Sequence, residues 1–236
     1  LLAIALLILI PGCKQSPGVT TGAPDEEYIL ICNRLDELMA GDLDDTVSLS
    51  DLRDVYSGKE IVGLGATLME YDGEIFFMDG NCYWADPNQD GKVAKLNWGR
   101  KKLPFCAITI VHMENGLKAE GVEGDVHQWV ESKASELGIK LAALKIDGIF
   151  NNVNLSITSS LPQGGEELQN TFVTVTEKNE WTFVGFYAAD EAEQNILSEA
   201  GRPVHLHGQM KSNEFGGHLQ KANSVYSEVI IFPIDE

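Results

Sequence analysis

Basic residues are scarce in this sequence: Lys and Arg number 17 against 36 Asp and Glu, a formal net charge of -19. Such an acidic surface repels phosphate backbones, so we expect no nucleic-acid partner. The acidic residues are scattered along the chain, so they do not indicate an acidic disordered tail. With 44% hydrophobic residues in 236, the chain suits one compact domain or two small lobes that share a core.

The sequence begins with an apolar run of ten residues, too short to cross a hydrocarbon core of about 30 Å as a helix. The length is typical of the apolar region of a signal peptide, and Gly12-Cys13 after it resembles a lipoprotein cleavage site. We therefore predict a lipoprotein signal over residues 1–13 with a lipidated Cys13; the alternative is an ordinary secretory signal. Residues 14–27, rich in Gly, Pro, Ser and Thr, are predicted to be a flexible tether.

These features predict an exported protein on the periplasmic or extracellular face of a membrane, which only its lipid anchor contacts. Besides Cys13, the chain has Cys32, Cys82 and Cys106, an odd number with no CxxC pair. Each of the three stands in an apolar stretch. We therefore expect small buried side chains, with at least one free thiol.

The fold class follows from strand and turn patterns. Asp72-Gly73 and Asp147-Gly148 each separate two apolar stretches, which is typical of tight β-hairpins. Short helices are predicted after three candidate N-cap residues, Asn33, Ser48 and Asp125. Strands that outnumber helices and are joined by hairpins indicate an α+β fold of mixed or antiparallel sheets with a few short helices.

Three histidines near the C-terminus form the candidate metal site. His205 and His207 are two residues apart in a predicted strand, so their side chains share one face. A hairpin after them would bring His218 beside the pair. Three imidazoles on strands suit zinc and leave a fourth position for water or substrate, although the ligand type also admits manganese or iron.

Other polar patterns favour structural roles. His112 and His127 are interpreted as surface or hydrogen-bonded core residues. Asp86–Gly91 resembles the start of a calcium-binding loop, but its twelfth position is Asn97, so we interpret it as a hairpin turn. A cupin-like metal enzyme is an alternative, since cupins also use two histidines on a strand; Glu214 is a poorly spaced match to the glutamate expected there.

A series of short motifs runs along both halves of the chain. The N-terminal half contains Asn33–Gly41, Thr67–Glu74, Met78–Gly80, Asp90–Val93 and Leu103–Thr109. The C-terminal half contains Lys145–Phe150, Val184–Phe186, His205–His207 and Phe215–His218. In these motifs and their order the chain resembles the alpha-acetolactate decarboxylase family, over roughly residues 28 to 232, and the last two motifs together are the specific ones.

The resemblance implies two β-rich lobes, about 28–140 and 141–236, with one zinc ion on His205, His207 and His218 between them. It implies a homodimer. It also places Thr67 and Glu74 in the pocket, with Glu74 in a proton-handling or substrate-positioning role. The implied reaction is decarboxylation of 2-acetolactate to acetoin and CO2, in which zinc stabilises the developing enediolate charge as a Lewis acid.

The sequence departs from the family at two places. Ser156 stands where the family has an active-site Arg, and strand parity turns the nearby Arg202 away from the histidines. The chain ends at Glu236, only 18 residues after His218, so Glu236 is not assigned the family's C-terminal glutamate role. The alternative function is therefore an altered or inactive zinc lipoprotein that binds or converts another small hydroxy-keto acid.

Overall fold

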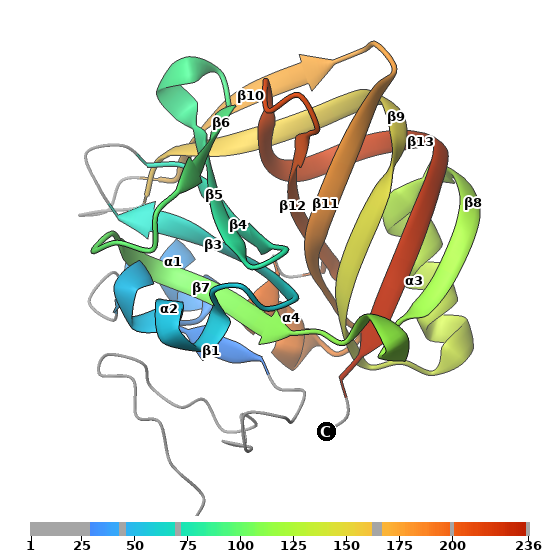
Figure 1. Ribbon diagram of the computed structural model, residues 1–236, viewed down its shortest axis with the longest axis horizontal. Coiled ribbons are helices and arrows are strands. Elements are labelled where there is room, and N and C mark those ends of the chain that lie inside the picture. Colours follow the sequence, from blue (N-terminus) through green and yellow to red (C-terminus); the bar gives the residue numbers. More distant parts are fainter. Residues whose placement is uncertain (1–28, 43–45, 69–71, 162–166, 199–200, 235–236) are drawn as a thin grey trace, which may run out of the picture.

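The computed structural model describes residues 29–42, 46–68, 72–161, 167–198 and 201–234. Cys13, the predicted signal and tether, and Glu236 lie outside these ranges. The described chain forms two antiparallel β-sheets that face each other (Figure 1). No helix in the described ranges is both long and apolar enough to span a membrane.

The first sheet contains the N-terminal strands and has the order β1-β7-β3-β4-β5-β6, with β2 paired to β7. These strands are β1 (Leu30–Cys32), β2 (Val47–Ser48), β3 (Ile61–Leu68), β4 (Glu74–Met78), β5 (Asn81–Asp86), β6 (Lys92–Leu96) and β7 (Lys102–Ile110). The predicted turn at Asp86–Gly91 is confirmed: it is a short 3-10 turn, η1 (Pro87–Gln89), between the antiparallel strands β5 and β6.

The second sheet has the order β10-β9-β11-β12-β13-β8, and a further pairing of β9 with β13 closes a ring of four strands. Its strands are β8 (Leu117–Asp125), β9 (Leu141–Ser160), β10 (Gln169–Val175), β11 (Asn179–Ala188), β12 (Val204–Met210) and β13 (Gly216–Pro233). The change from one sheet to the other thus falls between Ile110 and Leu117, ahead of the lobe boundary near residue 140 expected from sequence.

Four short helices and a second 3-10 turn, η2 (Met113–Asn115), complete the described structure. The helices are α1 (Leu35–Met39), α2 (Leu49–Tyr56), α3 (Val126–Leu137) and α4 (Glu191–Leu197). Ser48 and Asp125 cap α2 and α3 as predicted, Ser48 through a capping box with Asp51. The prediction for Asn33 was wrong by one residue, because the N-cap of α1 is Arg34. The Asn33 side chain instead accepts a hydrogen bond from the backbone N–H of Arg34.

One hydrophobic core joins the two sheets. Phe76 and Phe105 from the first sheet and Val184 and Phe186 from the second belong to the same buried cluster. A second, smaller cluster lies on the other face of the first sheet under α2, and it contains the three described cysteines, which are buried as predicted. The shared core holds the facing surfaces of the sheets in a fixed relation.

The predicted hairpin at Asp147-Gly148 was wrong, because β9 continues through both residues. Strands β9 and β13 approach each other closely at Gly148, where a Cβ would lie 2.5 Å from the backbone oxygen of Tyr226 on β13. Asp147 accepts a hydrogen bond from the Thr182 hydroxyl on the neighbouring β11. The turn-like dipeptide therefore marks where β13 pairs closely with β9.

The predicted two-residue turn at Asp72-Gly73 was also wrong in detail. Strands β3 and β4 do pair antiparallel, but Ala66 is opposite Glu74, so the connection spans residues 67–73. This register fixes where Glu74 enters the first sheet.

Candidate metal centre

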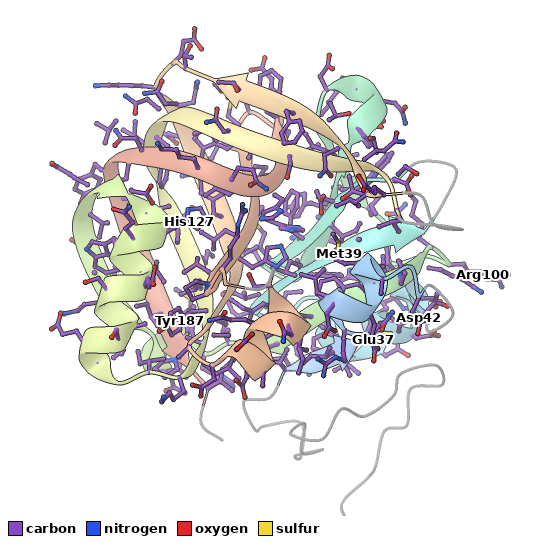
Figure 2. The ribbon with its side chains drawn as sticks, turned by 180° about the vertical axis from the view of Figure 1, so that it is seen from behind. Glu37, Met39, Asp42, Arg100, His127 and Tyr187 are labelled. Carbon is purple, nitrogen blue, oxygen red and sulfur yellow. The ribbon has the colours of Figure 1, made fainter. Side chains whose placement is uncertain are left out.

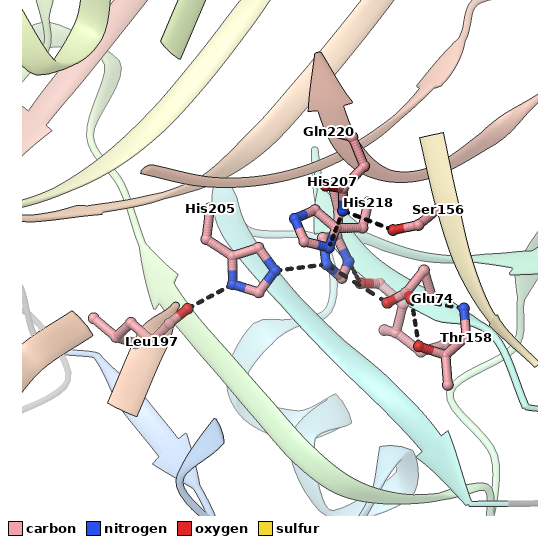
Figure 3. Close-up of polar contacts among 9 residues, drawn as sticks. Glu74, Ser156, Thr158, Leu197, His205, His207, His218 and Gln220 are labelled. Atoms are coloured by element: carbon pink, nitrogen blue, oxygen red, sulfur yellow. Dashed lines mark hydrogen bonds and ion pairs between the residues drawn. The ribbon is translucent and has the colours of Figure 1, made fainter. Parts of the chain in front are cut away.

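Three histidines converge from two neighbouring strands (Figure 3). His205 and His207 project from one face of β12, and His218 on β13 is directly opposite His207 in the strand register. One nitrogen from each ring lies within 4.8 Å of the others. The predicted hairpin thus brings the third imidazole to the pair.

Hydrogen bonds to two of these rings determine which ring nitrogen carries the hydrogen. His205 Nδ1 lies 2.6 Å from the carbonyl oxygen of Leu197, and His207 Nδ1 lies 2.9 Å from that of Ile75 on β4. A carbonyl oxygen only accepts, so each Nδ1 carries the hydrogen and each Nε2 has a free lone pair. These two Nε2 atoms face each other at 3.0 Å. Two lone pairs that face each other in a buried site repel, and a cation bound to both nitrogens would remove that repulsion.

Burial keeps the three rings in the form that binds metals. Burial lowers the pKa of His205 to about 3, with a smaller contribution from His207, and it lowers the pKa of His207 to about 4. Burial and then the two neighbouring rings also bring the pKa of His218 well below its usual value. All three imidazoles are therefore neutral at neutral pH, as metal coordination requires.

The donor set fits a small divalent cation. A zinc ion bound at about 2.0–2.1 Å to each ring in tetrahedral geometry would hold the nitrogens roughly 3.3 Å apart. The His205 and His207 nitrogens are close to that separation, and a nitrogen of His218 is near enough to complete the trio. His205, His207 and His218 could therefore hold one metal ion.

Glu74 brings a carboxylate from the opposite sheet to this centre. It is the first residue of β4, it is 5% exposed, and its Oε2 lies 3.6 Å from His207 Nε2. Its Oε1 accepts hydrogen bonds from the backbone N–H of Thr158 at 2.9 Å and from the Thr158 hydroxyl at 2.7 Å. Thr158 thus fixes one oxygen and directs the other toward the histidines.

A cavity of about 50 Å³ adjoins the histidines and Glu74 between the two sheets. About 10–15 Å³ of such volume admits one water molecule, so the cavity has room for a metal ion and a ligand the size of several waters. Its apolar walls include Leu35, Leu38, Met39, Phe105, Leu161 and Leu168. Met39 on α1 (labelled in Figure 2) is 41% exposed, so this part of the wall reaches the protein surface. The site is thus a mostly apolar cavity with a few convergent polar groups, as small-molecule sites usually are.

A chain of polar side chains approaches His218 from the outside of the site. Arg202 Nη1 donates to Gln220 Oε1 at 2.9 Å, and Gln220 Nε2 donates to Ser156 Oγ at 2.9 Å. The same Gln220 nitrogen lies 3.4 Å from His218 Nδ1. Arg202 precedes β12, so the parity expected from sequence does not apply, and its guanidinium reaches across to β13.

The other candidate residues lie apart from the centre. Glu214 is exposed in the turn between β12 and β13, which removes the argument for a cupin-like site. His112 is exposed and His127 at the start of α3 is half-buried (Figure 2), and neither ring belongs to the group of three histidines. Thr67 belongs to β3, and its side chain is not among those described.

Sequence reasoning missed Thr158 and Gln220. Thr158 contacts Glu74 across 84 residues, and no local motif signals that pairing. Gln220 follows His218 by two residues in β13, so strand parity after the last histidine was the one available signal.

Comparisons with known proteins identify the family of this chain. The profile of the family described as alpha-acetolactate decarboxylase matches residues 29–236. The fold is similar to acetolactate decarboxylase from Bacillus subtilis strain 168, with a TM-score of 0.70 and 21% identity over 87% of this chain and 85% of that one. It is also similar to a Staphylococcus aureus protein of unknown function that resembles alpha-acetolactate decarboxylase, with a TM-score of 0.68 and 19% identity over 88% and 86% of the two chains. No curated protein sequence matches the chain. The family match spans the whole folded part, and the chain therefore belongs to the alpha-acetolactate decarboxylase family.

Proposed function

We propose that this protein is a zinc-dependent carboxy-lyase that converts 2-acetolactate to acetoin and CO2. The observation that carries the proposal is the meeting of three neutral imidazoles with the buried Glu74 carboxylate, whose Oε2 is 3.6 Å from His207 Nε2. Family membership supports the same reaction class. Zinc is proposed because three imidazoles in an enclosed site are a common zinc donor set.

The chemistry divides between the bound metal and the protein. When bound, the metal would supply Lewis-acid stabilisation of the negative charge that develops as CO2 leaves. The three histidines would hold the metal ion in place. The apolar walls of the cavity exclude bulk water, which strengthens electrostatic interactions inside it.

Glu74 is our candidate for proton transfer at this site. Thr158 holds Oε1, so the Oε2 side of the carboxylate is directed at the reacting region. Loss of CO2 must be followed by protonation of the carbon it leaves, and a fixed carboxyl group can deliver that proton to one face. Thr67, on the adjoining β3, is proposed as a further pocket residue.

The test is acetoin formation from racemic 2-acetolactate by the zinc-loaded protein. We expect wild-type turnover, and we expect His207→Ala to abolish it because the variant loses a ligand. A matched control is His112→Ala, which removes an exposed histidine. A folded wild-type protein that contains one zinc ion and yields no acetoin would overturn the proposed reaction.

We further propose that the chain is exported as a lipoprotein anchored through Cys13 and that it acts as a homodimer. The apolar run followed by Gly12-Cys13 supports the first proposal, and the family resemblance supports the second. A Cys13→Ala variant should lose its membrane association, and sedimentation of the mature domain should give the mass of two chains.

A further inference from the structure

Ser156 occupies a position on β9 that no catalytic role yet explains. It is directly opposite His218 in the pairing of β9 with β13, and it is two residues from Thr158 along the strand. Residues with these relations share one face of a sheet. Both neighbours line the metal-site cavity, so the Ser156 side chain, which is 3% exposed, is on the same face of the sheet and adjacent to residues of the cavity wall.

The orientation of the Gln220 amide is settled by Arg202. A guanidinium group only donates hydrogen bonds, so the atom of Gln220 that is 2.9 Å from Arg202 must be the oxygen. The amide nitrogen therefore points the other way and donates to Ser156 Oγ at 2.9 Å. Arg202 thus determines that Ser156 is an acceptor toward Gln220.

The hydroxyl hydrogen of Ser156 is then left to point elsewhere. Within the described part of the chain, Ser156 Oγ receives this bond from Gln220 and has no acceptor for its own hydrogen. A buried donor without an acceptor is costly, and native structures usually satisfy such groups with protein, water or ligand. The face it occupies leads to the cavity beside His218.

We propose that Ser156 donates a hydrogen bond to an oxygen atom of a 2-hydroxy acid bound at the metal centre, and that Gln220, oriented by Arg202, is the positioning residue that directs this hydrogen into the cavity. The inference rests on the proposed function, because it assumes a substrate rich in oxygen beside the histidines. The group that recognises the substrate oxygen is then the neutral hydroxyl of Ser156.

The test uses the cobalt-loaded protein and the stable compound 2,3-dihydroxy-2-methylbutanoate. This compound keeps the oxygen atoms of 2-acetolactate, but its reduced ketone prevents loss of CO2. Its binding is followed by the change in the visible cobalt absorption. We expect Ser156→Ala to weaken binding by up to about tenfold, the scale of one hydrogen bond, with unchanged cobalt content.

Three further variants distinguish the direction of the Ser156 hydrogen bond from a purely structural role of this residue. Ser156→Thr keeps a hydroxyl and should bind within about twofold of wild type. Gln220→Glu places a carboxylate that only accepts beside Ser156, so the hydroxyl hydrogen should turn to it and binding should weaken as in Ser156→Ala. Ser227→Ala removes a buried serine whose hydroxyl bonds to the Val122 carbonyl on β8, and it should bind as wild type.

The outcomes distinguish the two proposals. Equal affinity in wild type, Ser156→Ala and Gln220→Glu, all fully cobalt-loaded, would overturn the role of Ser156 and leave the proposed function standing. Absence of binding by the wild type, together with no acetoin formation, would overturn both. If Ser156→Ala fails to fold, the comparison of Ser156→Thr with Gln220→Glu decides.

Discussion

At the scale of single residues, hydrogen-bond direction determines the chemistry of the centre. The carbonyl groups of Leu197 and Ile75 each take an Nδ1 hydrogen, which leaves the Nε2 atoms of His205 and His207 as lone-pair donors. Thr158 holds Oε1 of Glu74, and Oε2 faces His207. The protein therefore presents two nitrogen lone pairs and a carboxylate oxygen toward one point before any ligand binds.

Glu74→Gln tests the carboxylate without disturbing its support. The amide oxygen can still accept both hydrogen bonds from Thr158, so fold and metal content should be unchanged. Because an amide does not transfer a proton, kcat for acetoin formation should fall on the order of 10²–10⁴-fold. The exposed Glu214→Gln is the matched control, and full turnover by Glu74→Gln would exclude Glu74 from proton transfer.

Asp72, just before β4, gives a stability prediction that depends on pH. Burial raises its pKa to about 6 from the usual 3.8, so the folded state holds the proton more tightly than the unfolded state. This contribution to stability is complete below pH 3.8 and is lost as the pH rises through 6. Asp72→Asn should therefore stabilise the protein by about 1 kcal/mol at pH 7.5, discounted for partial exposure, and by much less at pH 4.

The measurement is urea unfolding of both proteins at the two pH values. A gain that is equal at pH 4 and pH 7.5 would show that ionisation of Asp72 is not its cause.

At the scale of elements, close strand packing places the histidines. Gly185 on β11 is opposite Leu206 on β12, between the two histidines, and a Cβ on Gly185 would clash with the backbone oxygen of His205. The space available to β12 therefore depends on this glycine.

Gly185→Ala should push β12 away from β11. We expect a loss of unfolding free energy of about 1–3 kcal/mol and weaker zinc binding, because His205 moves with its strand. Gly99→Ala is the control, since the nearest atom to its added Cβ is at 3.7 Å and its effect should be small. Thermal unfolding measures the loss of stability, and zinc titration measures the affinity for zinc. Unaltered zinc affinity in a destabilised variant would show that the contact between Gly185 and β12 does not position the histidines.

The same scale shows what the sequence can predict. The alternation of His205 and His207 is a local property of one strand, and the polar turn after them predicts the return of His218. The length of β9 was not predictable in this way, because Asp147-Gly148 has the local signature of a turn and its glycine is explained only by β13 packing against it. Thr158 and Gln220 depend on register between distant strands, which no local pattern encodes.

At the scale of the whole molecule, the candidate site joins two sheets. The histidines belong to the second sheet, whereas Glu74 and the carbonyl of Ile75 come from β4 in the first. Lys145 on β9 forms an ion pair at 2.6 Å with Asp79, which follows β4, so another polar contact crosses the same boundary. The α+β class and the few short helices agree with the prediction, and the shared core keeps both halves of the site in position.

The most direct test of the account is a zinc titration of the metal-free protein, with acetoin release from 2-acetolactate as the readout. The account predicts that activity rises in proportion to added zinc, reaches a plateau at one equivalent per chain, and stays at background in His207→Ala. Full activity before zinc is added, or a zinc-saturated wild type that releases no acetoin, would contradict it.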